Sequence, residues 1–414
     1  MRVLFLCYRG NPYCGGQGIY LYHLTRELGK LGVEMDVLVG PPYPEPMDEW
    51  ASVYRIENLN LWCERTMRLP YEKLTRIYSP WNFVDYFLTR FHVFPEMETF
   101  SLRAFFRMKG LLREKRYDIV HDVQCLGWGL LPMKAYGMPI VSTVHHPLTM
   151  DREADFLIDR GFWEHATTVL FYPLSMQRIV INRLNRVITS SNEGVGTLGK
   201  AFGLPEDRLS VVYNGMDVET FRSTGETRRE RTLLFVGNTE DHKKGMRYLF
   251  EALAMLPEDV TLTIVDEGPP KRLTAWGMIQ ELGLGKRVVF TGKVDLSTLV
   301  GLYSTCTVAV MASLHEGFGL PAAEAMACET PVVATTAGAL PEVVGDDGAG
   351  ILVPPKNPAA IRDAVATLLA DAALRKAMGK KGRARAERNF AWPVAARNTL
   401  AVYQDVIESY RSRS

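Results

Sequence analysis

The stretch SLHEGFGLPAAEAMACETPVVAT, Ser313 to Thr335, decides the fold. An apolar strand is expected before it at Val308 to Met311, and another at its end, Val332 to Ala334. Between the strands, Pro321 suits the first turn of a helix, because the N–H group that proline lacks would have no partner there. A strand, a glycine loop, a helix and a second strand form the repeating unit of a parallel α/β sheet.

Two glutamates, Glu316 and Glu324, lie on either side of the glycine loop. Gly317 and Gly319 let the backbone approach a ligand closely, and the helix N-terminus favours an anion such as a diphosphate. Glu324 can accept two hydrogen bonds from a vicinal diol such as a ribose, and Glu316 can accept them from sugar hydroxyls. The competing interpretation is that the glutamates are solvated and the glycines only form a turn.

Length and composition limit the classes of protein. The chain has 414 residues, which predicts two domains. A net charge of +1 lacks the basic excess of a nucleic-acid-binding protein. The six cysteines form no CxxC pair, so we expect reduced thiols and no metal site. The segment MRVLFLCYRGNPYCGG lacks the longer apolar core and the small-residue cleavage site of a signal peptide, and no apolar run reaches about 18 residues, so we expect a cytoplasmic protein.

Strand-like and helix-like segments alternate along most of the chain, which predicts parallel α/β sheets. Asp48 to about Arg113 is irregular and aromatic, and Phe156 to Leu184 is compatible with a long helix. The expected strands of the first half are Val3 to Cys7, Met35 to Val39, Asp118 to His121, Pro139 to Thr143, Arg186 to Thr189 and Leu209 to Val212.

The same alternation restarts after the charged segment STGETRRERT, residues 223–232, which we interpret as the linker. Further strands are expected at Thr232 to Val236, Thr261 to Val265 and Arg287 to Thr291. The sequence predicts two Rossmann-like domains, 1–220 and 221–392, that face each other across a cleft. The C-terminal helix, 393–414, is expected to pack back on the N-terminal domain.

The motif EGFGLPAAEAMACETPVVAT resembles the E-x7-E signature of retaining glycosyltransferases of family 4, which have the GT-B fold. Other segments that resemble this family are FVGN with KKGMRYLFEAL, FTGKV with LVGLYSTCTVAVMAS, GALPEVVGDDGAGILVPPKNPAAI, and the linking turn YNGMDVETF. The resemblance is strong from Leu209 to about Trp392 and weaker over the first half. It implies an acceptor-binding N-terminal domain and a C-terminal domain that binds a nucleotide sugar.

The resemblance also assigns roles to residues. It implies that Glu324 contacts the ribose of the donor, that Glu316 contacts the transferred sugar, and that Lys244 neutralises the leaving diphosphate. The remaining donor-binding positions are Gly317, the backbone N–H groups of Phe318, Gly319 and Leu320, and Val294 and Asn238.

Asn238 departs from the family pattern. The family has an arginine at this position, six residues before the lysine, so one positive charge is missing here. Lys243, His242 or Arg9 are the candidates to replace it. If none does, we expect weaker donor affinity or an unusual donor.

Two loops of the first half carry the remaining site predictions. CGGQG, Cys14 to Gly18, is neither a dinucleotide-binding fingerprint nor a P-loop. It resembles the family's glycine loop, in which the backbone of Gly16 faces the donor diphosphate; the alternative is a plain tight turn. In STVHHPLT, the resemblance implies that His145 contacts the transferred sugar, with His146 as the alternative.

The implied mechanism is front-face departure and attack with retention, rather than a covalent sugar–enzyme intermediate. We expect no cofactor and no metal, with a UDP- or GDP-sugar as donor. The predicted acceptor is a hydroxyl of a glycan, a lipid-linked glycan or a small molecule. The aromatic and basic stretches Trp62 to Arg116 and Phe156 to Arg186 suit either a core-facing insertion or a peripheral contact with the inner face of the cytoplasmic membrane.

Two other classes of function stay open at this point. One is a GT-B phosphorylase or epimerase. The other is a nucleotide-sugar-binding protein without turnover, and the replacement of the family arginine by Asn238 is the feature that favours it.

Overall fold

The computed structural model describes residues 1–11, 16–44, 46–61, 77–91, 93–156, 161–266 and 274–412. The chain divides into two compact units. The N-terminal unit consists of Met1–Ser190, Gly194–Val212 and Ala395–Ser414. The C-terminal unit consists of Ser191–Glu193 and Tyr213–Val394.

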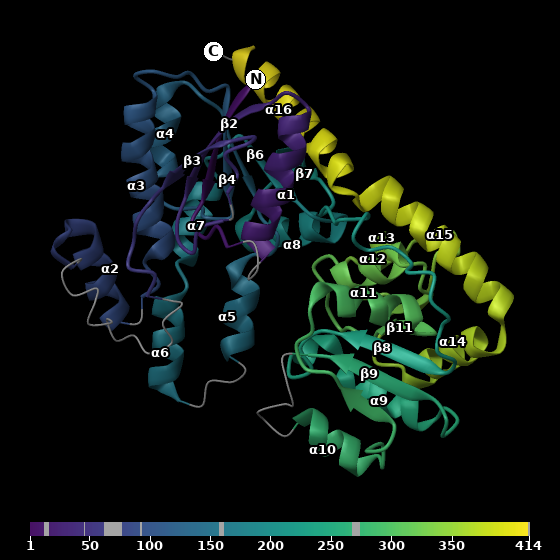
Figure 1. Cartoon of the computed structure of the whole chain (residues 1–414). Helices are drawn as coiled ribbons and strands as arrows, with labels where there is room; N and C mark the ends of the chain where they lie inside the picture. The colour runs from purple at the N-terminus through teal and green to yellow at the C-terminus, as the bar shows by residue number, and fades with distance from the viewer. Residues whose placement is uncertain are drawn as a thin grey trace. The chain divides into compact units, whose positions relative to one another are not determined.

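A parallel sheet forms the centre of the N-terminal unit, and its seven described strands have the order β3-β2-β1-β4-β5-β6-β7 (Figure 1). The central strands are short apolar runs that are buried along their length, as expected when helices cover both faces of a parallel sheet. The strands are β1 (Arg2–Cys7), β2 (Glu34–Val39), β3 (Ser52–Arg55), β4 (Ile119–Val123), β5 (Ile140–Thr143), β6 (Arg186–Thr189) and β7 (Leu209–Val211).

Helices cover this sheet from two sides. The helices of the N-terminal unit are α1 (Gly16–Lys30), α2 (Pro80–Arg90), α3 (Glu96–Leu111), α4 (Leu130–Met133), η2 (Lys134–Tyr136), α5 (Leu148–Phe156), α6 (Phe162–Phe171), α7 (Leu174–Ile181), α8 (Asn192–Phe202), η3 (Glu206–Arg208) and α16 (Trp392–Arg411). On one side, Leu4 of β1 joins a core cluster with Phe100 of α3 and Val180 of α7. On the other side, Tyr403 of α16 is fully buried against β4.

A chain of buried polar groups joins α16 and α1 to the sheet. His121 of β4 bonds the hydroxyl of Tyr403 through Nδ1, and its Nε2 lies 2.8 Å from Oγ1 of Thr143 in β5. Thr143 in turn lies 3.0 Å from the hydroxyl of Tyr20 in α1. Burial lowers the pKa of His121 to about 3, so the imidazole is neutral and each of its nitrogens has a partner.

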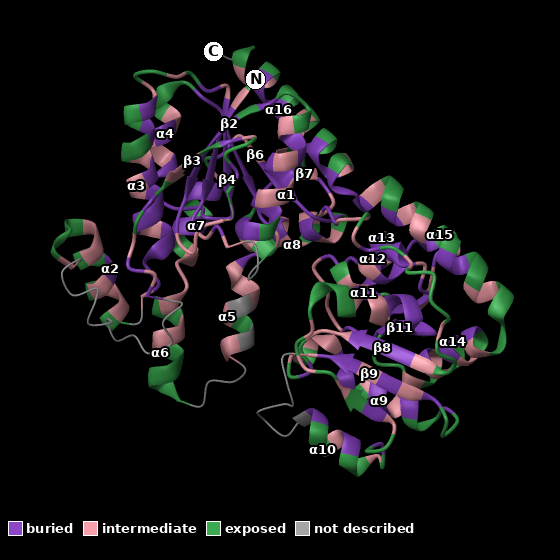
Figure 2. Cartoon of the chain, viewed as in Figure 1, coloured by how far each residue is buried: buried purple, intermediate pink, exposed green. Residues whose placement is uncertain are grey.

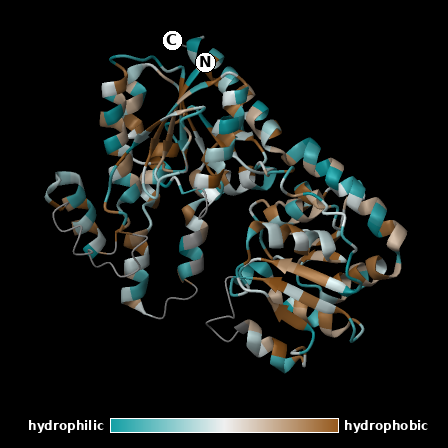
Figure 3. Ribbon diagram, in the orientation of Figure 1, coloured by the Kyte–Doolittle hydropathy of each residue, from teal (hydrophilic) through white to brown (hydrophobic). Residues whose placement is uncertain are grey.

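The C-terminal unit contains a second parallel sheet, whose six described strands have the order β10-β9-β8-β11-β12-β13. Figure 2 shows the central strands as buried, and Figure 3 shows their hydrophobic character. The strands are β8 (Thr232–Val236), β9 (Thr261–Val265), β10 (Val288–Phe290), β11 (Val308–Met311), β12 (Val332–Thr335) and β13 (Ile351–Val353).

The helices of this unit pack on both faces of its sheet, α9 beside α14 and α12 beside α15. They are η4 (His242–Lys244), α9 (Met246–Ala254), α10 (Thr274–Glu281), α11 (Leu296–Thr305), α12 (Leu320–Ala327), α13 (Leu340–Val344), α14 (Pro358–Ala370) and α15 (Ala372–Phe390). The predicted Rossmann-like character of both halves is confirmed, because each half is a parallel sheet covered by helices.

The expected linker differs from the observed division of the chain. The predicted boundary lies after residue 220, whereas the division falls between Val212 and Tyr213. The reason is that the turn at Met216 packs with the C-terminal unit. The backbone N–H of Met216 donates to the carbonyl oxygen of Phe390 at 2.7 Å, and the backbone N–H of Trp392 donates to the carbonyl oxygen of Met216. The segment from Ala395 onward groups with the N-terminal unit.

Two parts of the first half also differ from expectation. β3 lies within the stretch predicted to be irregular; it is an edge strand with no fully buried residue, so it lacks a buried strand's apolar run. The expected long helix from Phe156 to Leu184 is divided, because α6 ends before Tyr172 and Pro173 precedes α7.

Candidate active site

Two loops of the C-terminal unit meet at the carboxyl edge of its sheet, the edge at which the strands end. They follow the neighbouring strands β8 and β11, where the strand order reverses, and ligands of open α/β sheets bind at such positions. Lys244 donates to Glu316, with Nζ 2.8 Å from Oε2, and Oγ of Ser313 lies 3.2 Å from the same oxygen. The fold therefore brings Lys244 and Glu316 together, and half-buried Gly317 follows directly.

Two glycines let these loops approach each other. Gly245 follows Lys244 with φ +64°, and a Cβ there would lie 2.1 Å from the carbonyl oxygen of Ala312. Gly338 has φ +57°, and a Cβ there would lie 2.1 Å from the carbonyl oxygen of Glu316. Because both positions combine left-handed backbone with backbone contact, any side chain would displace the loop that carries Glu316.

The loop between Glu316 and α12 presents its backbone rather than its side chains. The ring of Phe318 is buried against Tyr213 and Phe390, with centroid distances of 6.1 and 5.5 Å. Gly319 is the N-cap of α12 and adopts a left-handed conformation. Within the described ranges, the N–H groups of Phe318, Gly319 and Leu320 donate to no protein acceptor. Three donors are thus available at the positive end of a helix.

Glu324 lies one turn into α12 and is held by a residue that the sequence did not suggest. The hydroxyl of Tyr303 in α11 donates to Oε2 of Glu324 at 2.9 Å. Burial raises the pKa of Glu324 to about 7, while the bond from Tyr303 lowers it. No spacing rule links positions 303 and 324, so this partner could be found only from the structure.

Asn238 does not restore the missing positive charge. It is exposed, and its Oδ1 accepts a hydrogen bond from the N–H of Glu240 at 2.9 Å. Of the suggested substitutes, His242 and Lys243 belong to η4 beside Lys244. Arg9 belongs to the N-terminal unit, where it pairs with Glu96 at 2.8 Å.

Val294 precedes α11. Its side chain is half-buried and packs against the core cluster that contains Val265 and Val300. This contact gives Val294 a role in packing beside the role in donor binding that the resemblance implies.

The carboxyl edge of the N-terminal sheet carries His145, which follows β5. The backbone N–H of His145 donates to Oε1 of Gln124 at 3.0 Å. Nε2 of the same glutamine side chain donates to the backbone carbonyl of His146 at 3.0 Å. The ring of His145 packs edge-on against Tyr20, with centroids 4.9 Å apart, whereas His146 is exposed. Gln124 is buried, has φ +52° and follows β4, so it fixes the backbone that carries both histidines.

The glycine loop after β1 is described only in part. Cys14 and Gly15 lie outside the described residues, and Gly16 begins α1 with open space around its Cβ position. Gly18 is the more constrained glycine, because a Cβ there would lie 1.9 Å from the carbonyl oxygen of Asn11.

Three further properties hold for the residues that the structure describes. No group of three or more His, Cys, Asp or Glu side chains among them could hold a metal ion. None of their helices is long and apolar enough to cross a bilayer. Cys7, Cys125, Cys306 and Cys328 are free and buried, while Cys14 and Cys63 lie outside the described ranges.

Two family descriptions match the chain. "Glycosyltransferase Family 4" matches residues 14–220, and "Glycosyl transferases group 1" matches residues 217–385. Among curated relatives, an MMP alpha-(1->4)-mannosyltransferase of Mycolicibacterium hassiacum is 36% identical and covers 98% of both chains. A D-inositol 3-phosphate glycosyltransferase of Corynebacterium glutamicum is 29% identical over 98% of this chain and 97% of its own.

Solved structures show the same fold at lower identity. Sucrose-phosphate synthase from Thermosynechococcus elongatus is 23% identical with a TM-score of 0.71, covering 99% of this chain and 100% of its own. HepE of Anabaena in complex with UDP is 18% identical with a TM-score of 0.69, covering 98% and 100%. The chain therefore belongs to glycosyltransferase family 4, has the GT-B fold of two parallel-sheet α/β domains, and is a glycosyltransferase.

Proposed function

We propose that this glycosyltransferase moves a hexosyl group, with retention of its anomeric configuration, from a UDP- or GDP-sugar to an acceptor hydroxyl. One observation carries the proposal: Lys244, Glu316 and the free N–H groups of residues 318–320 converge at one sheet edge. A diphosphate needs a cation and hydrogen-bond donors, and a sugar needs acceptors for its hydroxyls. This edge offers both.

Lys244 is the group that stabilises the departing diphosphate. As the bond between the sugar and the diphosphate breaks, negative charge grows on the oxygen that leaves, and a fixed cation stabilises that charge. In the structure the ammonium group is paired with Glu316. A bound diphosphate would share the ammonium group of Lys244 with Glu316. The ion pair therefore holds Lys244 at the position where negative charge develops. With Lys244 and the helix N-terminus in this role, the transfer needs no metal and no cofactor.

Glu324 is the proposed partner of the ribose. Its Oε2 already accepts from Tyr303, and its other oxygen can accept from a vicinal diol. Binding of the diol favours the ionised carboxyl group, whose pKa is raised by burial in the protein alone. Val294 and Asn238 complete the proposed donor site.

Retention is proposed to proceed by front-face attack. A covalent intermediate would need a carboxylate that is free to attack the anomeric carbon. Oε2 of Glu316 instead accepts hydrogen bonds from both Lys244 and Ser313, which suits a group that orients sugar hydroxyls. The protein then acts chiefly by holding the reactants and stabilising charge.

The acceptor is proposed to bind at the N-terminal unit, whose His145 is proposed to contact the transferred sugar and whose Gly16 is proposed to face the donor diphosphate through its backbone. Relatives differ in acceptor: one is named for MMP and several for D-inositol 3-phosphate. We therefore propose a hydroxyl of a glycan, a lipid-linked glycan or a small molecule.

Three experiments test the proposal. A thermal-shift screen of UDP, GDP and ADP with their sugars should show stabilisation by one base only. NMR of the product should then show the anomeric configuration of the donor, and EDTA should leave the rate unchanged. A product of opposite configuration, or a rate abolished by EDTA and restored by a divalent metal, would contradict the mechanism.

A peripheral membrane contact is a second candidate property, and exposed aromatic side chains favour it. On α2 and its C-cap, Phe83, Phe87 and Phe91 are half exposed and lie ring against ring. On α6, Phe162 and Trp163 are each 79% exposed. Such side chains suit the interface of a bilayer, which would place the enzyme at the inner face of the cytoplasmic membrane. Failure to co-sediment with anionic liposomes would exclude this contact.

A further inference from the structure

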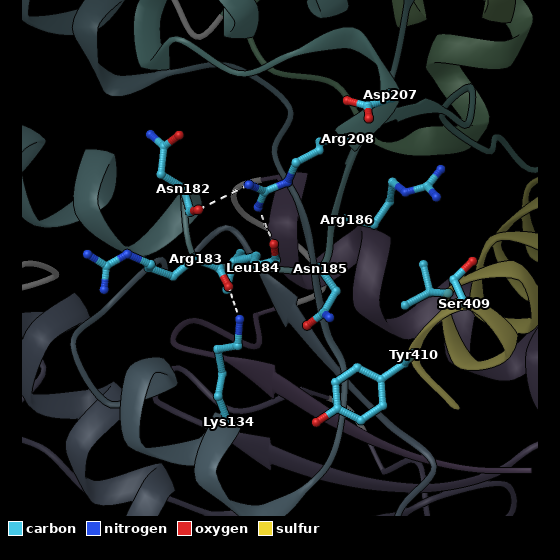
Figure 4. Close-up of a pocket in the computed structure, with 11 residues that line it drawn as sticks. Lys134, Asn182, Arg183, Leu184, Asn185, Arg186, Asp207, Arg208, Ser409 and Tyr410 are labelled. Carbon is cyan, nitrogen blue, oxygen red and sulfur yellow. Dashed lines mark hydrogen bonds between the residues drawn. The ribbon is translucent and has the colours of Figure 1, made fainter. Parts of the chain in front are cut away.

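The two ends of β6 lead to different surroundings. At its amino end lies a pocket of about 380 Å³, which Figure 4 shows. Basic side chains there have partners of their own: Arg208 donates to the carbonyl oxygen of Asn182 at 3.1 Å, and Arg186 pairs with Asp405 at 2.7 Å. At its carboxyl end, β6 leads into residues 191–193, which belong to the C-terminal unit.

Segment 191–193 is held by Glu342 of α13. Oε2 of Glu342 accepts from the backbone N–H of Asn192 at 2.8 Å and from its side-chain amide at 2.7 Å. Oε1 accepts from the backbone N–H of Glu193 at 2.9 Å. Hydrogen bonds to a carboxylate are stronger than those between neutral groups, and N–H groups at the start of a helix lack helical partners. Glu342 thus fixes the start of α8 from the family segment GALPEVV, to which sequence reasoning gave no role.

Ser191 connects this segment to residues 316–320, which we call the donor loop. Ser191 is fully buried, and its Oγ donates to the carbonyl oxygen of Gly317 at 3.1 Å. The ring of Phe318, the next residue of the loop, packs against Tyr213, whose hydroxyl donates to Oε2 of Glu342 at 3.3 Å. Glu342 therefore holds both the segment that carries Ser191 and the ring that supports Phe318.

The contact from Ser191 sets the direction of an N–H group in the donor loop. A trans peptide group is planar, so its C=O and N–H point in opposite directions. The bond between Gly317 and Phe318 is trans. With the carbonyl of Gly317 turned toward Ser191, the N–H of Phe318 points away from Ser191. At the preceding bond, the carbonyl of Glu316 accepts from the N–H of Ala339 at 2.9 Å, which directs the N–H of Gly317 in the same manner.

This control is needed because residue 317 is a glycine. Glycine adopts more backbone conformations than any other residue, so the peptide group after Gly317 turns easily unless its carbonyl is held. A turned group would present a carbonyl oxygen, which repels a phosphate, in place of an N–H. Capping of α8 alone would explain Glu342. It does not explain Ser191, whose hydroxyl reaches the donor loop instead of the helix.

We propose that Ser191 is a positioning residue for the donor: through the carbonyl of Gly317 it directs the N–H of Phe318 toward the diphosphate, and Glu342 keeps Ser191 in place. The proposal rests on the proposed function, in which the N–H groups of the donor loop bind the diphosphate. A donor that is already oriented needs no reorganisation when the ligand binds. The property that depends on Ser191 is therefore the preference for a nucleoside diphosphate over the monophosphate.

Calorimetry on the full-length chain measures this preference with UDP and UMP, and with GDP and GMP. In Ser191→Ala the ratio of diphosphate to monophosphate affinity falls by about tenfold, because one hydrogen bond to a charged phosphate is lost, while the monophosphate affinity stays unchanged. Glu342→Ala lowers the ratio in the same way. Asp371→Ala is the matched control: Asp371 caps α15 by accepting from the N–H of Leu374 at 2.9 Å, and its loss leaves the ratio unchanged. Thermal melting verifies that all variants fold.

A double variant tests whether Ser191 and Glu342 act through one contact. The ratio in Ser191→Ala with Glu342→Ala should lie within about twofold of that in the more affected single variant, because coupled residues are not additive. Additive losses would overturn the link between the two residues.

Two further outcomes separate this proposal from the proposed function. A wild type that binds diphosphate and monophosphate equally would overturn the assignment of the donor loop and the role of Ser191 with it. A wild-type preference that survives Ser191→Ala, or an equal loss of both affinities in that variant, would overturn the positioning role alone.

Discussion

The carboxyl edges of the two sheets differ in how they use charge. In the C-terminal unit, Lys244 and Glu316 form an ion pair with side chains 20% and 16% exposed. In the N-terminal unit, His145 contacts two neutral groups, the amide of Gln124 and the phenol of Tyr20, and the neutral imidazole of His121 also packs against Tyr20. Glu316 is thus held by a fixed charge, whereas Gln124 and Tyr20 offer His145 neutral contacts; the N-terminal edge also carries an ion pair after β1, between Arg9 and Glu96.

This difference matches the chemistry proposed for each half. A diphosphate leaving group gains charge during the reaction, so a fixed cation lowers the barrier. A hydroxyl acceptor is neutral and needs correct placement more than charge. Changes at the C-terminal edge are therefore expected to have larger effects than changes at the N-terminal edge, and four predictions test this order.

Lys244→Ala gives the largest expected effect. Loss of the cation that stabilises the leaving group should lower kcat by about 10²–10³-fold, the size typical of removing one group that stabilises developing charge. Steady-state kinetics with the donor found in the screen measures it. Lys286→Ala, an exposed lysine of the same unit, serves as the control and should keep full activity. A loss below about tenfold for Lys244→Ala would remove the C-terminal edge from the mechanism.

Gly338→Ala should disrupt the C-terminal edge through its backbone. The new methyl group would lie 2.1 Å from the carbonyl oxygen of Glu316, in left-handed backbone, so we expect a loss of about 2–4 kcal/mol in the free energy of unfolding. Denaturant unfolding measures it.

Gly301→Ala is the matched control for Gly338→Ala. Gly301 lies inside α11 and nothing lies within 4 Å of its Cβ position. Alanine there should raise the free energy of unfolding by up to about 1 kcal/mol, because it favours the helix. Equal free energies of unfolding for Gly338→Ala and Gly301→Ala would show that the fold does not depend on the close backbone contact at Gly338.

Glu324→Gln should alter how stability depends on pH. The pKa of Glu324 is raised to about 7 in the folded protein, from an ordinary 4.5, so the folded state holds a proton that the unfolded state has lost. Stability from this group is present below pH 4.5 and is lost as pH rises through 7. Relative to the wild type, Glu324→Gln should therefore gain about 2 kcal/mol between pH 5 and pH 8. Parallel thermal melts measure the difference, and identical pH profiles would show that the carboxyl group is ionised throughout.

Gln124→Leu gives the smallest expected effect. The amide holds the backbone of His145 and His146 by two hydrogen bonds, and leucine of similar size makes neither. We expect kcat/KM for the acceptor to fall by about tenfold, while the affinity for the free nucleotide stays unchanged. Kinetics at varied acceptor measures the first, and a thermal-shift titration with the nucleotide measures the second. A larger loss of nucleotide affinity than of acceptor turnover would contradict the proposed role of the N-terminal edge.

Sequence reasoning reached the C-terminal edge because its chemistry is local. Glu316, Gly319 and Glu324 lie in one strand–loop–helix unit, so their spacing alone places them at a sheet edge. Lys244 came from the family resemblance, and its contact with Glu316 appears only once the two loops are folded together. The roles of these four residues in donor binding and catalysis stay predictions.

The parts that sequence reasoning missed depend on distant contacts. Gln124 and Tyr303 act on residues 21 positions away through tertiary packing, which no periodicity encodes. Within residues 48–113, α2 was missed for another reason: it exposes aromatic side chains, so its apolar pattern does not match a single buried face.

The residues of α16 are shared between the two units, so a gene cut at a single position does not yield two complete halves. The first residues of α16, Trp392 to Val394, group with the C-terminal unit, and the remainder completes the N-terminal unit. A coding sequence that stopped at residue 212 would encode a first half without Tyr403. The buried ring nitrogen Nδ1 of His121 would then lose the hydroxyl group that is its hydrogen-bond partner. Separate production of that half therefore requires the last twenty residues to be supplied as well, as a joined segment or an added peptide.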